Sequence, residues 1–328
     1  MQRKNVILTA GIVMALIAAT IIVFVATPVP MSLMMRKAFE SPKLSAPTGY
    51  ASMETTVAVQ HDLVYPSSYG ENTLDLYLPK GQSDFSLPVI LWVHGGAYVG
   101  GDKSDARYYC TALAARGYAV ISMNYARAPE ARYPTPITQM QEVYAWLCTF
   151  EKKYSLDLSR MFLAGDSAGA HSAATFALIQ TNPDYAAKLF LKSVVPAGHI
   201  RGLLLYCGPY DVQMLDDIPG FFGFMISRAG WAYFGSRHWV TDFGELATIR
   251  YHLTADYPPV FITDTNAASF KPQGQALAEA LTRANIPVKS YFPPDVEETT
   301  HEYQFLMDTL SGAQCYEKTL AFLNEYLN

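Results

Sequence analysis

Beyond about residue 55, apolar residues fall into short continuous runs, separated by stretches in which they recur with a helical period. Continuous runs are typical of strands buried on both faces, and their alternation with helices predicts an α/β fold with a mostly parallel sheet. The predicted strands are residues 55–60, 73–79, 88–93, 118–124, 160–165, 200–207, 258–263 and 287–292. The main predicted helices are residues 105–117, 135–154, 167–182, 271–285 and 313–327. The first two strands alternate more between apolar and polar residues, so they could form an antiparallel edge.

The N-terminal segment differs, because it runs without a charge from residue 6 to residue 26. At 1.5 Å per residue a helix of this length spans roughly 30 Å, about the thickness of a bilayer's hydrocarbon core. A cleaved signal peptide has a shorter apolar region and small residues before its cleavage site, where this chain has Phe24. We therefore expect residues 1–30 to be an uncleaved transmembrane anchor. The alternatives are a cleaved signal peptide and a buried core helix.

The orientation of this anchor depends on the basic residues at its two ends. Arg3 and Lys4 precede the span, while Arg36, Lys37 and Lys43 follow it, so the two sides nearly balance. A short N-terminus usually stays inside, which favours an extracytoplasmic catalytic domain. Free thiols, which are more common in reducing compartments, argue weakly for the opposite orientation.

The rest of the chain divides into a short connection and one large domain. We expect residues 31–54 to be a linker or lid, and residues 55–328 to be the α/β domain. Residues 210–250 interrupt the alternation of strands and helices and are rich in Phe, Trp, Tyr and Gly. Since aromatic side chains often line ligand pockets, we expect an inserted cap there, with an ordinary irregular connection as the alternative.

Charge and cysteine content argue against two classes of function. The formal net charge is −5 and no run of Lys and Arg follows the first segment, so we expect no nucleic-acid partner. Cys110, Cys148, Cys207 and Cys315 are far apart and form no metal-binding spacing. We therefore expect buried thiols, with a disulfide as the alternative, and no metal site.

A candidate nucleophile stands between a predicted strand and a predicted helix. Gly165-Asp166-Ser167-Ala168-Gly169 is a GxSxG sequence at the end of the strand RMFLAG. In this setting the serine occupies a sharp turn, and the glycines let strand and helix approach each other. The helix N-terminus then directs its N–H groups at developing negative charge. We expect Ser167 to be the nucleophile, although a structural Gly/Ser turn is the alternative.

A glycine-rich loop after the third predicted strand supplies a candidate oxyanion hole. The loop reads HGGAY from residue 94 and is of the HGGG type, in which backbone N–H groups bind the oxyanion. The expected donors are the amides of Gly95, Gly96, Ala97 and, after the nucleophile, Ala168. Because such a hole uses backbone groups, His94 itself is expected to be structural.

These motifs resemble those of the α/β-hydrolases, and in particular the hormone-sensitive-lipase-like, acetyl-esterase-like carboxylesterases. In chain order the matching stretches are HGGAYVGG, NYARAPEARYPTP, AGDSAGA and THEYQF, within about residues 55–328. The resemblance implies an eight-stranded, mostly parallel sheet, a helical cap over the site and no cofactor. It also implies hydrolysis of carboxylic esters with short or medium acyl chains.

The histidine of such a site follows the nucleophile and the acid in the chain. His301 comes after the last predicted strand and begins the match to the family's HGF-like motif. His171 lies only about one helical turn beyond the nucleophile, and His199, His238 and His252 precede the last β–α unit. We expect His301 to be the general base and later the general acid, with a helix-capping histidine as the alternative.

The catalytic acid departs from the family's pattern. The family's strand followed by G-x-x-D-P-L aligns with PPVFITDTNAASF, in which the Asp position falls on Ala268. Asp264, four residues earlier at the end of the same strand, is the preferred replacement. The alternatives are Asp211 after the preceding strand, Glu297 or Glu298 in the loop before His301, and no carboxylate, with Asn266 holding the imidazole.

Together these residues predict an acyl-transfer enzyme that cleaves a small-molecule ester through an acyl-enzyme on Ser167. A peptidase or amidase with the same fold is one alternative. A membrane-tethered binding module is another, and Ala268 is its main support. Since loss of a triad acid lowers the rate by about 10⁴-fold and leaves other catalytic effects in place, Ala268 alone does not exclude an enzyme.

Overall fold

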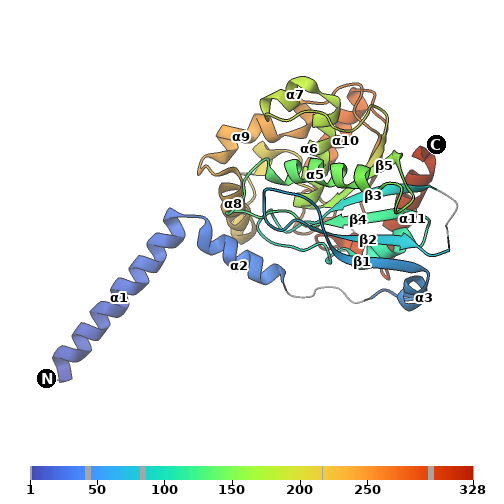
Figure 1. Ribbon diagram of the computed structural model, residues 1–328. Coiled ribbons are helices and arrows are strands. Elements are labelled where there is room, and N and C mark those ends of the chain that lie inside the picture. Colours follow the sequence, from blue (N-terminus) through green and yellow to red (C-terminus); the bar gives the residue numbers. More distant parts are fainter. Residues whose placement is uncertain (1, 41–45, 82–85, 216, 295–298, 328) are drawn as a thin grey trace.

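The computed structural model describes residues 2–40, 46–81, 86–215, 217–294 and 299–327, and Figure 1 shows their arrangement. One sheet lies at the centre of the described chain, and its eight strands follow the order β1-β2-β4-β3-β5-β6-β7-β8. The strands are β1 Val57–Val64, β2 Thr73–Pro79, β3 Leu87–Val93, β4 Ala119–Met123, β5 Leu156–Asp166, β6 Ile200–Tyr206, β7 Val260–Thr263 and β8 Val288–Tyr291.

The strand directions bring several carboxyl ends to one edge of the sheet. β1 and β2, and then β2 and β4, pair antiparallel, whereas the pairs from β4 through β8 are parallel. At the carboxyl edge Val93 pairs with Gly165, and Asp166 with Tyr206. The predicted fold class, with its antiparallel edge, is thereby confirmed.

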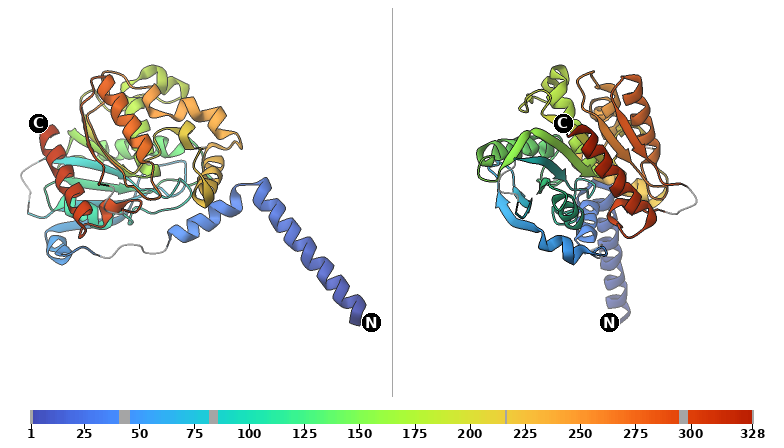
Figure 2. Two further views of the ribbon diagram at one scale, coloured as in Figure 1. Left: turned by 180° about the vertical axis from the view of Figure 1, so that it is seen from behind. Right: turned by 90° about the vertical axis from the view of Figure 1, so that its right-hand side faces the viewer.

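Helices cover both faces of this sheet, as the views in Figure 2 show. Successive residues of a strand point to opposite faces. Leu91 therefore packs in a core with α5 (Thr135–Phe150), α6 (Ala168–Thr181) and α10 (Lys271–Arg283). Its neighbour Trp92 packs on the other face with α4 (Arg107–Ala114) and α11 (Leu310–Tyr326). Burial on both faces explains why these strands read as continuous apolar runs.

The N-terminal segment leaves this body as a long helix, α1 (Gln2–Ala26). Its stretch Thr9–Ala26 is long and apolar enough to cross a membrane, a property that anchors and signal sequences share. A second helix, α2 (Val29–Phe39), follows after a bend and packs against the body beside α8 (Gly220–Phe234). The stretch expected to be a linker or lid thus contains a helix, followed later by the short α3 (Tyr50–Thr55).

The aromatic stretch between β6 and β7 also folds into helices. It forms a 3₁₀ turn (Val212–Leu215), α8 (Gly220–Phe234) and α9 (Trp239–Ala247). Their apolar side chains form a third cluster that includes Tyr98 of the glycine-rich loop, whose ring stacks on Tyr233 with centroids 3.8 Å apart. The helices therefore pack directly over the loop expected to form the oxyanion hole.

The junction of β5 and α6 depends on two glycines. A Cβ on Gly165 would lie 2.5 Å from the backbone carbon of Gly169. A Cβ on Gly169 would overlap the carbonyl oxygen of Val93 in the neighbouring strand. Strand and helix approach so closely that a side chain at either position would force the backbone apart.

We expect Gly169→Ala to lower the free energy of unfolding by roughly 1–3 kcal/mol, the usual cost of overpacking a well-packed interior. Thermal unfolding of the full chain in detergent measures the effect. Gly70→Ala is the matched control, because a Cβ there has no neighbour within 4 Å. Equal midpoints for the two variants would contradict the close approach.

Candidate active site

Ser167 stands in the turn between β5 and α6. Its backbone has a φ of 49°, a conformation that non-glycine residues rarely adopt. The turn is held because the Ser167 amide donates to the carbonyl oxygen of Tyr206 at 2.8 Å. The residue is buried but for 8% of its surface, so its hydroxyl group meets a confined space rather than bulk solvent.

His301 reaches this hydroxyl group from the other end of the chain. Its Nε2 lies 3.0 Å from Ser167 Oγ, within hydrogen-bond distance. The ring of Phe270 lies edge-on to the imidazole, with centroids 5.7 Å apart. The structure thus brings together two residues separated by 134 positions, in the arrangement of a nucleophile and its general base.

The glycine-rich loop offers fewer free amides than its sequence suggests. The Gly95 amide donates to Asp166 Oδ2 at 2.8 Å, so it is not available to an oxyanion, and this part of the prediction is corrected. The other oxygen of Asp166 accepts a bond from Trp92 Nε1 at 2.8 Å. The remaining candidate donors are the amides of Gly96, Ala97 and Ala168, for which the described chain shows no hydrogen-bond acceptor.

Two buried histidines support the loop. His94 stacks on Tyr125 with centroids 4.4 Å apart, and its Nδ1 lies 2.7 Å from the Gly95 carbonyl oxygen. His171 links Tyr98 of the loop to the Ala247 carbonyl oxygen at the end of α9. Burial lowers the pKa of both histidines to about 4, so both rings are neutral near pH 7. Each is a structural residue in this arrangement.

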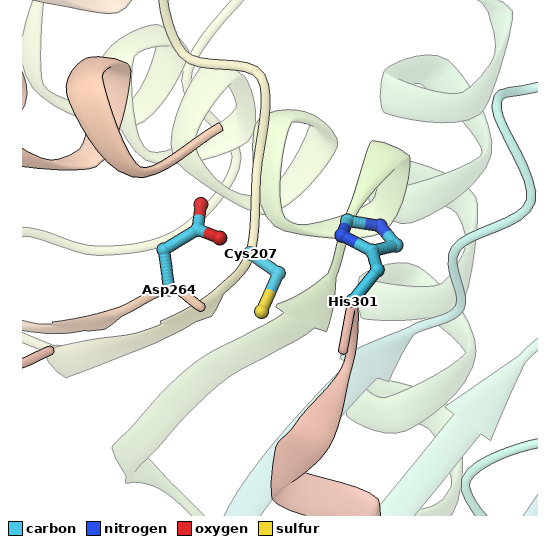
Figure 3. A group of neighbouring side chains, drawn as sticks. All are labelled: Cys207, Asp264 and His301. Carbon is cyan, nitrogen blue, oxygen red and sulfur yellow. The ribbon is translucent and has the colours of Figure 1, made fainter. Parts of the chain in front are cut away.

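Asp264 lies next to His301 without bonding to it directly. A carboxylate oxygen of Asp264, the Cys207 sulfur and an imidazole nitrogen of His301 all lie within 4.8 Å of one another (Figure 3). Asp264 Oδ1 accepts a bond from the Thr265 amide at 2.8 Å, and the described chain offers Oδ2 no partner. Because the carboxyl group is fully buried, its pKa is raised to about 7.

The other candidate acids are placed less favourably. Asp211 accepts bonds from Arg250 Nε at 2.8 Å and from the Gln213 amide at 3.1 Å, so it is engaged with the base of the cap. Glu297 and Glu298 lie outside the described residues.

In the loop after β7, Asn266 Oδ1 accepts a hydrogen bond from the Thr299 amide at 3.0 Å. Ala268, where the family pattern places Asp, has a φ of 49° in the loop after β7.

The group of Cys207, Asp264 and His301 has the distances of a metal site but not its chemistry. A thiol must lose its proton to bind a metal, and burial raises the pKa of Cys207 well above its ordinary value. His301 already directs one ring nitrogen at Ser167. These three residues fit a hydrolytic site better than a metal centre.

Sequence analysis missed a second acidic side chain at the site. Glu302 has a left-handed backbone with a φ of 61°, and its Oε1 lies 3.8 Å from His301 Nε2. It also lies beside Asp166, whose pKa is raised by burial and, secondarily, by the negative charge of Glu302. The only advance signal was a Glu directly after His301, at the glycine of the HGF-like motif.

Two pockets of unequal size meet at Ser167. The larger has a volume of about 390 Å³ and extends from Ser167 and His301 towards α2 and α8. Its apolar wall includes Met35, Phe39 and Phe222. The smaller has a volume of about 30 Å³ and lies between Ser167 and the cap, where its lining includes Leu215, Phe234 and Trp239. A bound molecule that reaches Ser167 would therefore place a small part on one side and a large part on the other.

Comparisons with known proteins identify relatives of this chain. The sequence profile of the BD-FAE family matches residues 74–281. An alpha/beta hydrolase of Acanthamoeba polyphaga mimivirus is 23% identical over 266 residues, which cover 78% of this chain and 71% of that protein. An acetyl esterase of Salmonella paratyphi B is 30% identical over 228 residues, which cover 64% of this chain and 62% of the relative. The match thus spans about three fifths of that acetyl esterase.

A solved structure extends the likeness to almost the whole chain. Esterase B of Lactobacillus rhamnosis superposes with a TM-score of 0.75 at 21% identity, covering 91% of this chain and 96% of that structure. At 21% identity, the superposition shows only that the two folds are alike. With the family match, it confirms the resemblance to α/β-hydrolases drawn from the motifs.

The buried Asp264 carboxyl group predicts a pH dependence of stability. Burial raises its pKa to about 7, above the value of about 3.9 for an unfolded chain. The folded state therefore holds the proton more tightly, and stability is lost as pH rises through 7. Relative to Asp264→Asn, the free energy of unfolding of the natural chain should fall by on the order of 4 kcal/mol between pH 4 and pH 8.

Chemical denaturation of both proteins at each pH gives this difference. The variant cancels the contributions of titrating groups that do not interact with Asp264. A constant difference across the range, or one that grows with pH, would contradict a raised pKa for Asp264.

Proposed function

The chain belongs to the BD-FAE family of α/β-hydrolases, and on this premise we propose that it is a serine carboxylesterase that removes short acyl groups. The observation that carries the proposal is the 3.0 Å approach of His301 Nε2 to Ser167 Oγ. It occurs where two pockets meet, beside a glycine-rich loop and the N-terminus of α6. The relationship to an acetyl esterase supports the same chemistry.

Acylation begins when Ser167 Oγ attacks the ester carbonyl carbon while His301 Nε2 accepts the hydroxyl proton. The carbonyl oxygen becomes an oxyanion, and the amides of Gly96, Ala97 and Ala168 are its proposed donors. The bond to the alcohol oxygen then breaks as His301 returns the proton to that oxygen. The alcohol leaves, and the acyl group remains on Ser167.

Deacylation repeats these steps with water. His301 accepts a proton from water, whose oxygen attacks the acyl carbon, and the bond to Ser167 Oγ breaks as that oxygen regains a proton. We assign Asp264 to the stabilisation of the imidazolium that forms in both halves of the reaction. Its buried carboxyl group lies close enough for a strong electrostatic interaction, and a positive charge on His301 would favour ionised Asp264.

The sizes of the pockets suggest which side holds which part of the ester. A space of about 30 Å³ accommodates a group of one or two carbons, whereas about 390 Å³ accommodates a large alcohol. We therefore assign the smaller pocket to the acyl group. An amidase with the same residues remains the alternative, and a binding module is disfavoured because Ser167, His301 and the loop amides are arranged for reaction.

We further propose that α1 anchors the enzyme in a membrane. The span Thr9–Ala26 has a mean hydropathy of 2.6, and none of it is buried against the body. An uncleaved anchor and an extracytoplasmic catalytic domain remain our expectations for its processing and orientation. Carbonate extraction of membranes from expressing cells tests the anchoring.

Ser167→Ala should abolish hydrolysis of p-nitrophenyl acetate, with a loss of about 10⁶-fold in kcat.

Asp264→Asn should lower kcat by about 10²–10⁴-fold, because His301 loses its anionic neighbour. The matched variant Asp211→Asn should change kcat per folded molecule less than about threefold, since Asp211 pairs with Arg250. A larger loss for Asp211→Asn than for Asp264→Asn would overturn the assignment of the acid. A loss of less than about 10²-fold in Ser167→Ala would overturn that of the nucleophile. Hydrolysis of p-nitroacetanilide at a similar rate would favour the amidase.

The small pocket predicts a preference for acetate esters over longer acyl chains. Leu215→Ala removes three carbons from its wall and should shift the preference from p-nitrophenyl acetate towards the butyrate by about tenfold in kcat/KM. Met225→Ala, in the wall of the large pocket, is the control and should leave the ratio unchanged. The reverse pattern would assign the acyl group to the large pocket.

A further inference from the structure

The helix that follows the membrane span is built into the active-site pocket. Met35 and Phe39 of α2 line the large pocket, and Phe39 contacts Gly100 of the glycine-rich loop. Arg36 fixes the helix there. Its Nε donates to the Val99 carbonyl oxygen at 2.8 Å, and its guanidinium group pairs with Glu130 at 2.6 Å. The wall of the pocket is thus connected directly to α1, with only the bend at Thr27 and Pro28 between them.

The opposite side of α2 and the start of α8 present apolar side chains to the surroundings. We call these residues the apolar rim: Val29, Leu33, Met34, Phe221 and Phe224, of which Phe221 is 70% and Met34 is 56% exposed. Side chains on the inner side of the same two helices pack together in one cluster. Grouped exposure of large apolar side chains is uncommon on a soluble surface and marks an interaction site.

The rim lies beside the end of the membrane span. Arg228 of α8 stacks over Phe224 with its guanidinium carbon 5.0 Å from the ring centroid, and its Nη1 lies 3.4 Å from the Val25 carbonyl oxygen of α1. Figure 1 shows the bend between α1 and α2 next to α8. When α1 spans a bilayer, its C-terminal end lies at the interface, where apolar side chains mixed with Arg are favoured.

We propose that the apolar rim docks on the bilayer interface, so that the large pocket receives the alcohol part of an ester dissolved in the membrane. This inference rests on the proposed esterase function and names its substrate class: short-chain acyl esters of long, lipophilic alcohols. The substrate passes from the bilayer between α2 and α8, whose side chains form both the rim and the pocket wall. Its carbonyl group then reaches Ser167, and the alcohol returns to the bilayer.

The test uses the full chain in phosphatidylcholine vesicles, with hexadecyl acetate in the bilayer and p-nitrophenyl acetate in the water. The double variant Leu33→Ser/Phe221→Ser should lower kcat/KM for hexadecyl acetate by about tenfold or more and change that for p-nitrophenyl acetate less than about twofold. Phe190→Ser is the matched control. Phe190 is 96% exposed just after α7 (Pro183–Lys188), which lies across the body from α1 (Figures 1 and 2).

The outcomes separate the docking from the chemistry. Equal losses for both substrates would overturn the proposal, because they would reflect a damaged pocket, and so would no loss for either. A natural chain that hydrolyses neither ester would overturn the proposed function instead.

A second measurement is independent of activity. The measured quantity is the fluorescence that each new Trp adds to that of the natural chain. In vesicles of brominated phosphatidylcholine, the fluorescence added by Phe221→Trp should be quenched by about half relative to ordinary vesicles. The fluorescence added by Phe190→Trp should be unchanged. Equal quenching of both variants, or of neither, would overturn docking through the rim. Loss of quenching together with cross-linked dimers would assign the rim to a second copy of the chain instead.

Discussion

The backbone of Gly169 lies against the carbonyl oxygen of Val93, at the point where β5 turns into α6. This contact sets the distance between the first turn of α6 and the carboxyl end of β3. It thereby places Ser167 at the carboxyl ends of β3 and β6. The same approach aligns the N-terminus of α6 with the glycine-rich loop that follows β3. Ser167 and the proposed oxyanion donors therefore share one steric constraint, which no side chain larger than hydrogen satisfies at position 169.

Buried carboxyl groups organise the site around this turn. Asp166 connects Trp92 and the Gly95 amide across the strands, so it fixes the glycine-rich loop but removes one amide from the oxyanion hole. Asp264 lies on the side of Cys207 and His301, and burial raises its pKa. A carboxyl group with a raised pKa ionises readily only next to a positive charge. Its proposed role thus depends on the imidazolium that forms during the reaction.

Much of this arrangement could be predicted from the sequence, because the parallel strands are buried on both faces and read as unbroken apolar runs. The GxSxG turn was predictable from its place between a strand and a helix, and His301 from its place after the last strand in a family-like motif. β5 begins at Leu156, whereas the sequence predicted a start near residue 160. The start was missed because the first apolar residues of β5 alternate with polar ones. β1 extends to Val64 past an irregularity near Asp62, where polar residues obscured the strand.

Other features depend on contacts between distant residues and had no local signal. The bond between Gly95 and Asp166 joins positions 71 apart, so nothing in HGGAY indicated that its first amide is occupied. The position of α2 in the pocket wall depends on packing against α8 and Val99, which no local pattern in residues 29–39 specifies. The position of Cys207 beside Asp264 follows from the pairing of β6 with β7 in the sheet, which the strand pattern alone did not specify.

We infer that Ser167 is a nucleophile activated by its surroundings. The most direct measurement is the intact mass of the full chain after brief treatment with a fluorophosphonate at neutral pH, followed by peptide mapping. We expect one stoichiometric adduct, located on the peptide that contains Ser167, which forms far more slowly in His301→Ala. No adduct in the folded natural chain, or an adduct on another residue, would contradict it.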